Sequence, residues 1–518
     1  MMAKGHRWER QGGIGMRSFR LISRCVVLLV VGTTITFEAG TATAAACKKS
    51  IAVKDAGDAA SPTSGQLRTA IAELCSGGTI LLPGGGIIDL AQGELVIPSG
   101  KILTIRSPSH QQQATIDAQG TSRVFWVQVN ASLTLRNVIV RGGDGAGINN
   151  DGSLTVTGGA VRDNAGVGIV NNGTGLVTLN GDTQVAANDF TGVFNLGELS
   201  DPAVGRLTLE DHATITGNAG ANGGGIFNTW GTVTLNDRSS VSGNTATFGG
   251  GIYAGFGFVT LNDDSSIQDN EASGEGGGIY NPAGSPIASN VLNDRSRITG
   301  NVGGGIGGRG YVTLNGDSTV AANTGTGIDN VRGGVILNDR SSVAANHGDG
   351  VSAFGVGVTM NDQSRISDNE GRGIGVADAG AVLNDESAVT GNDDGGVSVS
   401  FGLLALNGSS TISGNTTQGD GGGVYFSDGY LILNDNSSIV GNVGRFGGGI
   451  YNLSFPVDPS ECPVLCVTLN GSSTITGNVA TGGAGGGIYN ENGGTVIVND
   501  NGSITGNSPD DCYPPASC

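Results

Sequence analysis

The chain has 518 residues, of which 95 are glycine and only 5% are aromatic, and its formal net charge is −19. The glycines are not spaced at every third position, which excludes a collagen triple helix, and the near-neutral hydropathy disfavours wholesale disorder. The 45 Asp and Glu residues outnumber the 26 Lys and Arg residues, which disfavours nucleic acid and anionic membranes as partners.

Residues 1–46 are typical of a secretory signal peptide. Three arginines between positions 17 and 24 precede the apolar run Val26–Val31, and small residues follow, so cleavage is expected near Ala44 or Ala46. Met16 is an alternative start. The apolar run is too short for a transmembrane helix, and the mature chain contains no other candidate span. A lipid anchor on Cys47 remains the alternative to free secretion.

Residues 47–150 are expected to form an N-terminal cap and the first irregular coils. Leu67, Ala70, Ile71 and Leu74 have helical spacing, which predicts a short amphipathic helix over residues 65–74 that plugs the first coil. Capping matters because the bare end of a stacked β-structure exposes unpaired strand edges. The following apolar stretches are expected to be strands: Thr79–Pro83, Ile87–Val96, Ile102–Ile105 and Ser132–Val140.

Residues 151–507 repeat a phrase close to VTLND-x-S-x-I-x-GN fourteen times, with a shortest period of 23 residues. In the copy anchored at Leu314, a β-branched residue follows at Val320, an asparagine at Asn323 and a third apolar residue at Ile328. Self-similarity of this length indicates a solenoid. Residues 508–518, which contain three prolines, are expected to form a C-terminal cap or tail.

The three apolar columns predict three short strands in each repeat, because Gly, Asn, Asp and Ser interrupt every apolar run before a helix can form. Three strands and three turns in about 23 residues make one coil of a parallel β-helix, in which identical residues stack about 4.8 Å apart. The fourteen copies and about three N-terminal coils predict roughly 17 coils. The asparagine columns are expected to be structural ladders at the turns.

Six cysteines remain after the leader is removed, an even number that suggests disulfides in an exported protein. Six cysteines allow fifteen pairings. Proximity in the sequence favours three of them: Cys47–Cys75, Cys462–Cys466 and Cys512–Cys518.

These repeats resemble the right-handed parallel β-helix superfamily that includes pectate lyases, and most of all the repeats of chlamydial polymorphic outer-membrane proteins. The motif GGGI at Gly223–Ile226 and Gly447–Ile450 is similar to that family's GGA-I, and Ile215–Asn218 is similar to its F-x-x-N. The resemblance implies an all-β, right-handed parallel β-helix solenoid. It does not imply one function, because this fold hosts enzymes, adhesins and passive surface proteins.

One group of candidate catalytic residues is an acidic patch on the shortest coils. Asp393 and Asp394 stand in a turn where most copies have glycine, and His347 and Asp349 are expected in the same turn one coil earlier. Paired carboxylates are the groups that glycoside hydrolysis requires. The alternative is a solvated turn, and the motif set of pectin hydrolases is absent from the sequence.

A second acidic feature is an aspartate column two residues after the anchor, which includes Asp237, Asp263 and Asp294. Stacked carboxylates repel each other, and either bound calcium or hydrogen bonds to turn amides would relieve the repulsion. No cofactor is predicted, with Ca²⁺ left as the open alternative.

The removal of six basic and two acidic residues with the leader leaves 20 basic and 43 acidic residues, a net charge of −23. Neutral glycans, surface proteins or cations are therefore the expected partners. The sequence predicts a secreted or surface-exposed structural, adhesive or glycan-binding protein, and a polysaccharide lyase or glycoside hydrolase is the alternative. Two long insertions, Pro282–Asn290 and Leu453–Cys466, are expected to lie at a ligand-facing edge.

Overall fold

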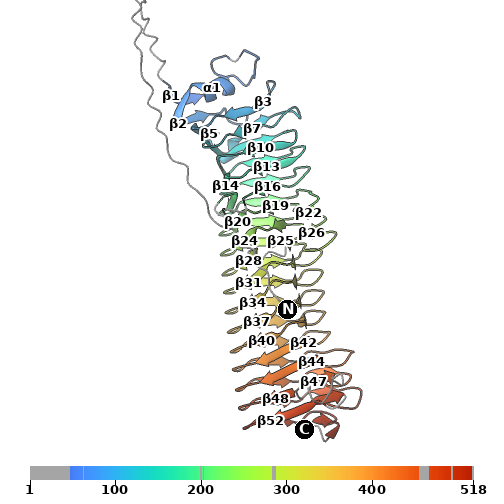
Figure 1. Ribbon diagram of the computed structural model, residues 1–518. Helices are drawn as coiled ribbons and strands as arrows, with labels where there is room; N and C mark the ends of the chain where they lie inside the picture. The colour runs from blue at the N-terminus through green and yellow to red at the C-terminus, as the bar shows by residue number, and fades with distance from the viewer. Residues whose placement is uncertain are drawn as a thin grey trace, which may run out of the picture. The chain divides into compact units, whose positions relative to one another are not determined.

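The computed structural model describes residues 47–61, 63–198, 201, 204–282, 288–453, 466–491 and 494–515. The predicted signal peptide and most of the two long insertions lie outside the described residues. Residues 47–518 form one compact unit, a stack of β-coils whose only α-helix among the described residues lies at the N-terminal end (Figure 1). The predicted parallel β-solenoid of about 17 coils is confirmed.

Each coil places one strand in each of three columns, and every strand pairs in parallel with its neighbours in the adjacent coils. The anchor column consists of β1 (Lys48–Ala52), β2 (Leu74–Leu81), β5 (Ile102–Arg106), β8 (Ser132–Arg136), β11 (Ser153–Thr157), β14 (Leu176–Asn180), β17 (Arg206–Leu209), β20 (Thr232–Leu235), β24 (Phe258–Leu261), β28 (Ser289–Leu292), β31 (Tyr311–Leu314), β34 (Val335–Leu337), β37 (Val358–Met360), β40 (Ala381–Leu383), the second halves of β42 (Val397–Leu406) and β44 (Val424–Leu433), β48 (Cys466–Leu469) and β52 (Thr495–Val498).

The second column follows the anchor column in each coil. Among the described residues it contains 17 strands: β3 (Ile87–Asp89), β6 (Ala114–Asp117), β9 (Val138–Arg141), β12 (Ala160–Arg162), β15 (Gln184–Ala186), β18 (Thr214–Thr216), β21 (Ser240–Ser242), β25 (Ser266–Gln268), β29 (Arg297–Thr299), β32 (Thr319–Ala321), β35 (Ser342–Ala344), β38 (Arg365–Ser367), β41 (Ala388–Thr390), β43 (Thr411–Ser413), β45 (Ser438–Val440), β49 (Thr474–Thr476) and β53 (Ser503–Thr505).

The third column completes each coil and carries the candidate site. It consists of β4 (Leu95–Ile97), β7 (Phe125–Val127), β10 (Ala146–Asn150), β13 (Val167–Asn171), β16 (Val193–Leu196), β19 (Ile226–Thr229), β23 (Ile252–Gly255), β27 (Ile279–Asn281), β30 (Ile306–Gly308), β33 (Ile328–Val331), β36 (Val351–Phe354), β39 (Ile374–Ala377), the first halves of β42 and β44, β47 (Ile450–Leu453), β51 (Ile488–Glu491) and β54 (Cys512–Tyr513).

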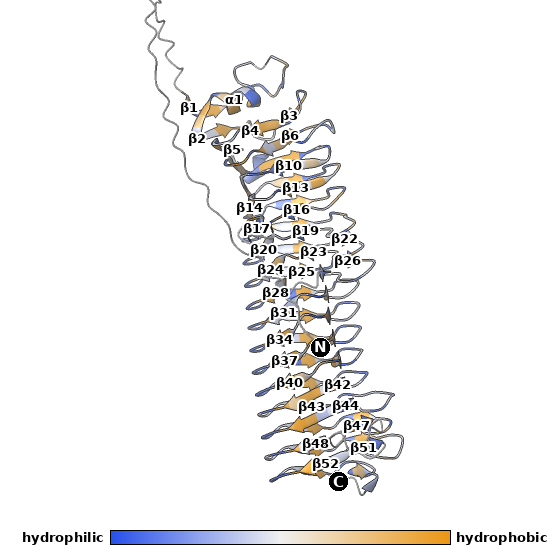
Figure 2. Ribbon diagram, in the orientation of Figure 1, coloured by the Kyte–Doolittle hydropathy of each residue, from blue (hydrophilic) through white to orange (hydrophobic). Residues whose placement is uncertain are grey.

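The core is made of identical residues stacked on themselves. Leu209, Leu235 and Leu261 lie in register on successive anchor strands and are fully buried. The second column stacks Val241 on Ile267 in the same way. Figure 2 shows the resulting apolar strands and polar turns. Each buried Leu, Ile or Val side chain stabilises the fold by about 1.5–3 kcal/mol, and the repeat places three or more of them in every coil.

A buried asparagine ladder fixes the turn between the second and third columns. The Nδ2 of Asn346 donates to the Oδ1 of Asn369 in the next coil at 2.9 Å, and Asn323 donates to Asn346 in the same way. The backbone N–H of each asparagine also donates to the next Oδ1. The ladder ends at Asn507, which donates to Asp511 Oδ1. The predicted structural role of this column is confirmed.

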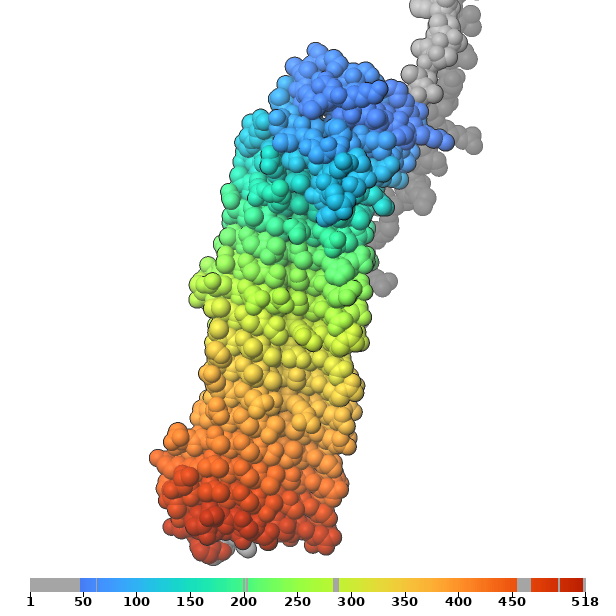
Figure 3. All heavy atoms as spheres, turned by 180° about the vertical axis from the view of Figure 1, so that it is seen from behind, coloured from blue at the N-terminus to red at the C-terminus, as the bar shows by residue number. Residues whose placement is uncertain are grey.

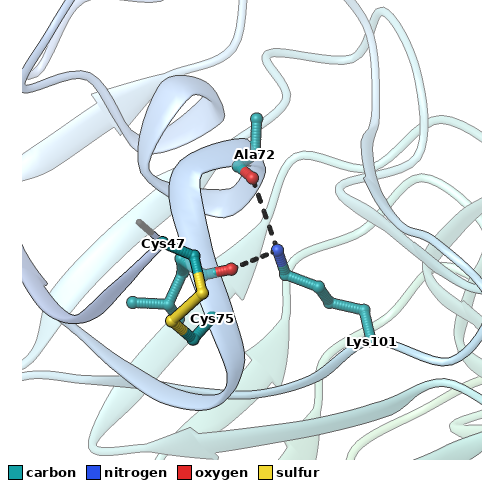
Figure 4. The surroundings of a disulfide bond; sticks show 5 residues. Cys47, Ala72, Cys75 and Lys101 are labelled. Carbon is teal, nitrogen blue, oxygen red and sulfur yellow. Dashed lines mark hydrogen bonds between the residues drawn. A yellow bond between two sulfur atoms is a disulfide. The ribbon is translucent and has the colours of Figure 1, made fainter. Parts of the chain in front are cut away.

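The predicted N-terminal helix is α1 (Leu67–Glu73), and its buried face is Leu67, Ala70 and Ile71. The predicted disulfide Cys47–Cys75 is present and joins the residue before β1 to β2. Figure 4 shows Lys101 beside it. The Lys101 Nζ donates to the carbonyl oxygens of Ala72 and Leu74 at the end of α1, where a cation satisfies free helix carbonyls.

At the C-terminal end, the proline-containing segment forms one more strand, β54, which pairs with β51. Cys512 is disulfide-bonded. Its predicted partner, Cys518, lies outside the described residues, as does Cys462.

Candidate functional site

Aromatic side chains stack on the outer face of the third column in two ladders. These residues follow the buried third-column residue and therefore point outward. The N-ladder is Phe194, Phe227, Tyr253 and Tyr280, and the C-ladder is Tyr425, Tyr451, Tyr489 and Tyr513. Ring centroids are 4.5–5.9 Å apart along the N-ladder and 5.2–5.5 Å apart along the C-ladder.

Between the two ladders, five coils carry small or acidic residues at the same register. In order, Tyr280 is followed by Gly307, Asp329, Ser352, Gly375 and Ser398, and then by Tyr425. We call this stretch the trough, and these five residues form its floor.

The turns that lead into the third column form the end walls of the trough, because they are short in the floor coils and longer in the coils on either side. In the five floor coils the turn from the second to the third column has six residues, as between Ala321 and Ile328. The coils on both sides have turns of nine to eleven residues, which carry the short paired strands β22 (Thr245–Ala246) with β26 (Glu271–Ala272) and β46 (Val443–Gly444) with β50 (Val479–Ala480). Figure 3 shows the narrower middle stretch, coloured yellow to light orange, between two broader ones.

A pocket of about 240 Å³ lies at the C-terminal end of the trough. Its lining includes Tyr425, Arg372, Asp394 and Asp420. Thr417 Oγ1 donates to Asp394 Oδ1 at 2.9 Å, and Asp420 is held by a two-bond pair with Arg445. The pocket is thus a fixed arrangement of one aromatic ring, two carboxylates and a guanidinium, which is the usual composition of a polar-ligand site.

The walls of this pocket are held in place by packing and by charge. The side chain of Asp420 is only 15% exposed, and its oxygens accept from the Arg445 guanidinium at 2.9 and 3.0 Å. Hydrogen bonding to Asp420 raises the pKa of Arg445. Tyr425 stacks on Tyr451, and partial burial raises the pKa of the Tyr425 hydroxyl. The hydroxyl is therefore a neutral donor at physiological pH.

Asp329 is the carboxylate on the floor of the trough. Its pKa is raised, first by partial burial and then by the carboxylates of Glu275 and Asp349, while a hydrogen bond with Ser352 opposes the shift. Asp349 Oδ1 accepts from the backbone N–H of Arg372 at 2.8 Å. The two side chains of that pair also approach the floor, because a Cβ at Gly375 would lie 3.5 Å from Asp349 Oδ2 and 3.7 Å from Arg372 Nη1.

The sequence-predicted acidic patch is only partly assembled. His347 and Asp393 occupy the same turn position, but they are two coils apart, because 46 residues are two periods of 23 and Glu370 takes the position between them. The expectation that they lie one coil apart is wrong. Asp393 and His347 are exposed, whereas Asp394 lines the pocket and Asp349 approaches the floor of the trough. The patch therefore contributes two of its four members to the candidate site.

The aspartate column lies on another edge of the coils, in the turn after the anchor strand. Asp237, Asp263 and Asp294 have φ values of 56–57°, and the same position is glycine in some coils, as at Gly316. The carboxylate of Asp263 accepts from the backbone N–H of Asp237 at 3.4 Å, and Asp294 accepts from Asp263. Turn formation thus accounts for these residues, and calcium binding stays a prediction. The described part of the chain holds no group of three metal-ligating side chains arranged for an ion.

A second hollow of about 720 Å³ lies on the same face nearer the N-terminus, lined by residues that include Glu94, Arg123, Asp144 and Asn149. Arg123 is paired with Glu94 at 2.7 Å and lies over the ring of Trp126. The charges of Arg123 and Glu94 thus neutralise each other, and no aromatic residue is among the residues that line this hollow.

Sequence reasoning missed Tyr280, Tyr425, Asp329, Arg372 and Asp420. The signal was present, because each outward residue of the third column directly follows an apolar residue that the repeat identifies. Reading that position down the chain gives aromatics, then five small or acidic residues, then aromatics again. The walls were not readable in this way, because they depend on turn lengths in several separate coils.

No helix in the described part of the chain is both long and apolar enough to span a bilayer. No family model matches the chain, so the resemblance to polymorphic outer-membrane repeats has no support beyond the fold, and no curated protein matches it.

Two solved structures share a low similarity with the chain. The mannuronan C-5 epimerase AlgE6 A-module of Azotobacter vinelandii has 15% identity and a TM-score of 0.36, over 78% of this chain and 94% of that one. The catalytic unit of the GH87 α-1,3-glucanase of Streptomyces thermodiastaticus has 12% identity and a TM-score of 0.27, over 89% of this chain and 69% of that one. At these values, neither likeness carries weight for the function of this chain.

Proposed function

We propose that this chain is an exported β-solenoid protein that binds glycans through the pocket at Tyr425. The observation that carries the proposal is the convergence of Tyr425, Arg372, Asp394 and Asp420 around one cavity of about 240 Å³. A pyranose ring presents an apolar C–H face that packs against an aromatic ring, and its hydroxyl groups donate to carboxylates. The disulfide Cys47–Cys75 supports an oxidising, extracellular location.

The test is retention of the purified protein by affinity electrophoresis on a panel of neutral, acidic and basic polysaccharides. Tyr425→Ala is expected to abolish retention, because it removes the ring against which a sugar would pack. Tyr430→Ala is the matched control: Tyr430 lies on the same strand, β44, but is 48% exposed over the anchor column, away from the pocket. Equal retention of both variants, or no retention of the unmutated protein, would refute the proposal.

A hydrolase or lyase is the second candidate, and Asp329 favours it. A carboxyl whose pKa is raised by partial burial and by neighbouring carboxylates is the pattern of a general acid. If cleavage occurs, the protein will release new reducing or unsaturated ends from the polysaccharide that it retains. Asp329→Asn would then eliminate release and keep retention. Retention without release, in the unmutated protein, supports the binding function alone.

A further inference from the structure

The two aromatic ladders end on either side of the trough. Stacked rings cover each other's faces, so most ladder residues present only their edges to solvent. Tyr280 and Tyr425 differ, because their neighbours on the trough side are Gly307 and Ser398. On the trough side, therefore, no further ladder ring lies beside either tyrosine. Tyr280 is also stacked on Phe248 of the preceding turn, with ring centroids 5.1 Å apart.

Both end rings lie over the trough. The ring of Tyr425 lines the 240 Å³ pocket together with Ser398. The ring of Tyr280 is tilted by 50° from that of Tyr253, and its Cδ2 lies 3.5 Å from where a Cβ would stand on Gly307. Six strand steps separate the two residues, which at about 4.8 Å a step is about 29 Å. That distance is far longer than one sugar ring.

The polar groups along the trough suit a ligand rich in hydroxyl donors. Asp329 lies on the floor, Asp349 and Arg372 approach Gly375, and Asp394 and Asp420 line the end near Tyr425. Arg372 already forms an ion pair with Asp349 at 3.8 Å, and Arg445 forms one with Asp420 at 2.9 Å. The carboxylates thus outnumber the cations, and an anionic ligand would be repelled.

We propose that the trough binds a neutral linear glycan laid along the stacking axis of the coils, with Tyr280 holding one end of the bound segment and Tyr425 the other. This inference rests on the proposed glycan-binding function and goes beyond it by naming the charge, the orientation and the length of the ligand. A chain that reaches both rings gains from two linked contacts, so its affinity rises with length until the trough is filled.

The test is the dissociation constant of a size series of neutral oligosaccharides, prepared from whichever polysaccharide the protein retains. Affinity is expected to increase at least tenfold from the disaccharide to the fragment that spans the trough, and then to level off. Tyr280→Ala should cancel this increase with length, whereas Tyr425→Ala should weaken every fragment.

A second variant blocks the middle of the trough without removing either tyrosine. Ser352→Tyr places a ring where the ladder coils already carry one, so it is compatible with the fold. It is expected to lower the affinity of the longest fragment to that of the disaccharide. The control is Ser342→Tyr, on β35 of the same coil but in the second column, which should change nothing.

The outcomes separate this inference from the proposed function. Binding that depends on Tyr425 but is independent of chain length, of Tyr280 and of Ser352→Tyr leaves the glycan-binding function standing and overturns the extended trough. Tighter binding of a polyuronate than of a neutral chain, or of an extended peptide than of any glycan, also overturns it. If no polysaccharide is retained at all, both fail together.

Discussion

Asp329 shows how a single position on the floor of the trough couples stability to pH. Its carboxyl has a raised pKa because it is partly buried and faces Glu275 and Asp349. The folded state therefore holds this proton more tightly than the unfolded chain does. The stabilisation of the folded state by this bound proton is fully present below the unfolded pKa of about 3.9, and it is lost as the pH rises through the pKa of the folded state.

Asp329→Asn is consequently expected to raise the melting temperature at neutral pH, with a gain that disappears as the pH falls toward about 4. Thermal unfolding of both proteins across this pH range is the measurement. Asp393→Asn, at an exposed turn position, is the control and should produce no pH-dependent gain. A gain for Asp329→Asn that persists undiminished at low pH would show that the carboxyl is not strained by its neighbours.

Asn346 is a representative residue of the buried asparagine ladder. Its Oδ1 accepts from the N–H and the Nδ2 of Asn323, and its own Nδ2 donates to Asn369 and to the carbonyl of Val320. Asn346→Ala leaves several of these groups without a partner away from water, at a cost of about 3 kcal/mol. Asn338→Ala, in the half-buried ladder after the anchor, should cost about 1 kcal/mol because water replaces the lost amide.

Chemical denaturation or local hydrogen exchange across β32, β35 and β38 would measure the difference between the two asparagine variants. Equal losses for both would mean that burial does not set the strength of the ladder.

In the turn after each anchor strand, substitutions can distinguish the effect of the backbone conformation from the effect of the aspartate charge. Asp362 has a φ of 57°, and glycine occupies the same position at Gly316 and Gly408. Asp362→Gly is therefore expected to be close to neutral, whereas Asp362→Val should destabilise the protein by about 1–2 kcal/mol, because a β-branched residue is strained in the left-handed region.

Calcium can be tested with the same variants. If calcium raises the melting temperature of the unmutated protein and not that of Asp362→Gly, cations bridge the aspartate column. If the two proteins respond alike, the column is only a series of turns.

The N-terminal cap is a second element whose stability can be changed separately from that of the later coils. The disulfide Cys47–Cys75 closes a segment with a sequence separation of 28 and holds β1 on β2. Its loss should cost the cap about 3 kcal/mol. Because coils in a solenoid contact mainly their neighbours, the cap should fray while the later coils stay intact. Hydrogen exchange after reduction should accelerate in β1 and β2 and not in β20, and uniform acceleration would contradict this.

The elements of the fold follow from the sequence to different degrees. The anchor Leu235, the β-branched Val241 and the ladder residue Asn244 recur at fixed offsets, and each of them is buried where the repeat predicts. Outside the repeats, the helical spacing of apolar residues locates α1, and proximity in the sequence locates the first disulfide. What the repeat does not contain is the trough, because a depression depends on the difference between six-residue and longer turns, and on which coils stack side by side. The error of one coil for His347 and Asp393 has a different origin, because their separation of 46 residues is two full periods of 23 and can be read from the sequence.

At the scale of the whole molecule, the net charge of −23 expected for the mature chain and the excess of carboxylates in the trough act in the same direction. Both repel polyanions at long range, and both are screened by salt. Neutral glycans are among the ligands that this field does not exclude, and the pocket at Tyr425 lies at the C-terminal end of the trough.

The measurement that tests this account most directly is the dissociation constant of a long neutral glycan, by titration calorimetry, for the unmutated protein, Tyr425→Ala and Tyr430→Ala. The account predicts at least a tenfold loss of affinity for Tyr425→Ala, which is about 1.4 kcal/mol, and no change for Tyr430→Ala. Equal affinity of all three proteins, or no binding by any of them, would contradict the assignment of glycan binding to this face of the solenoid.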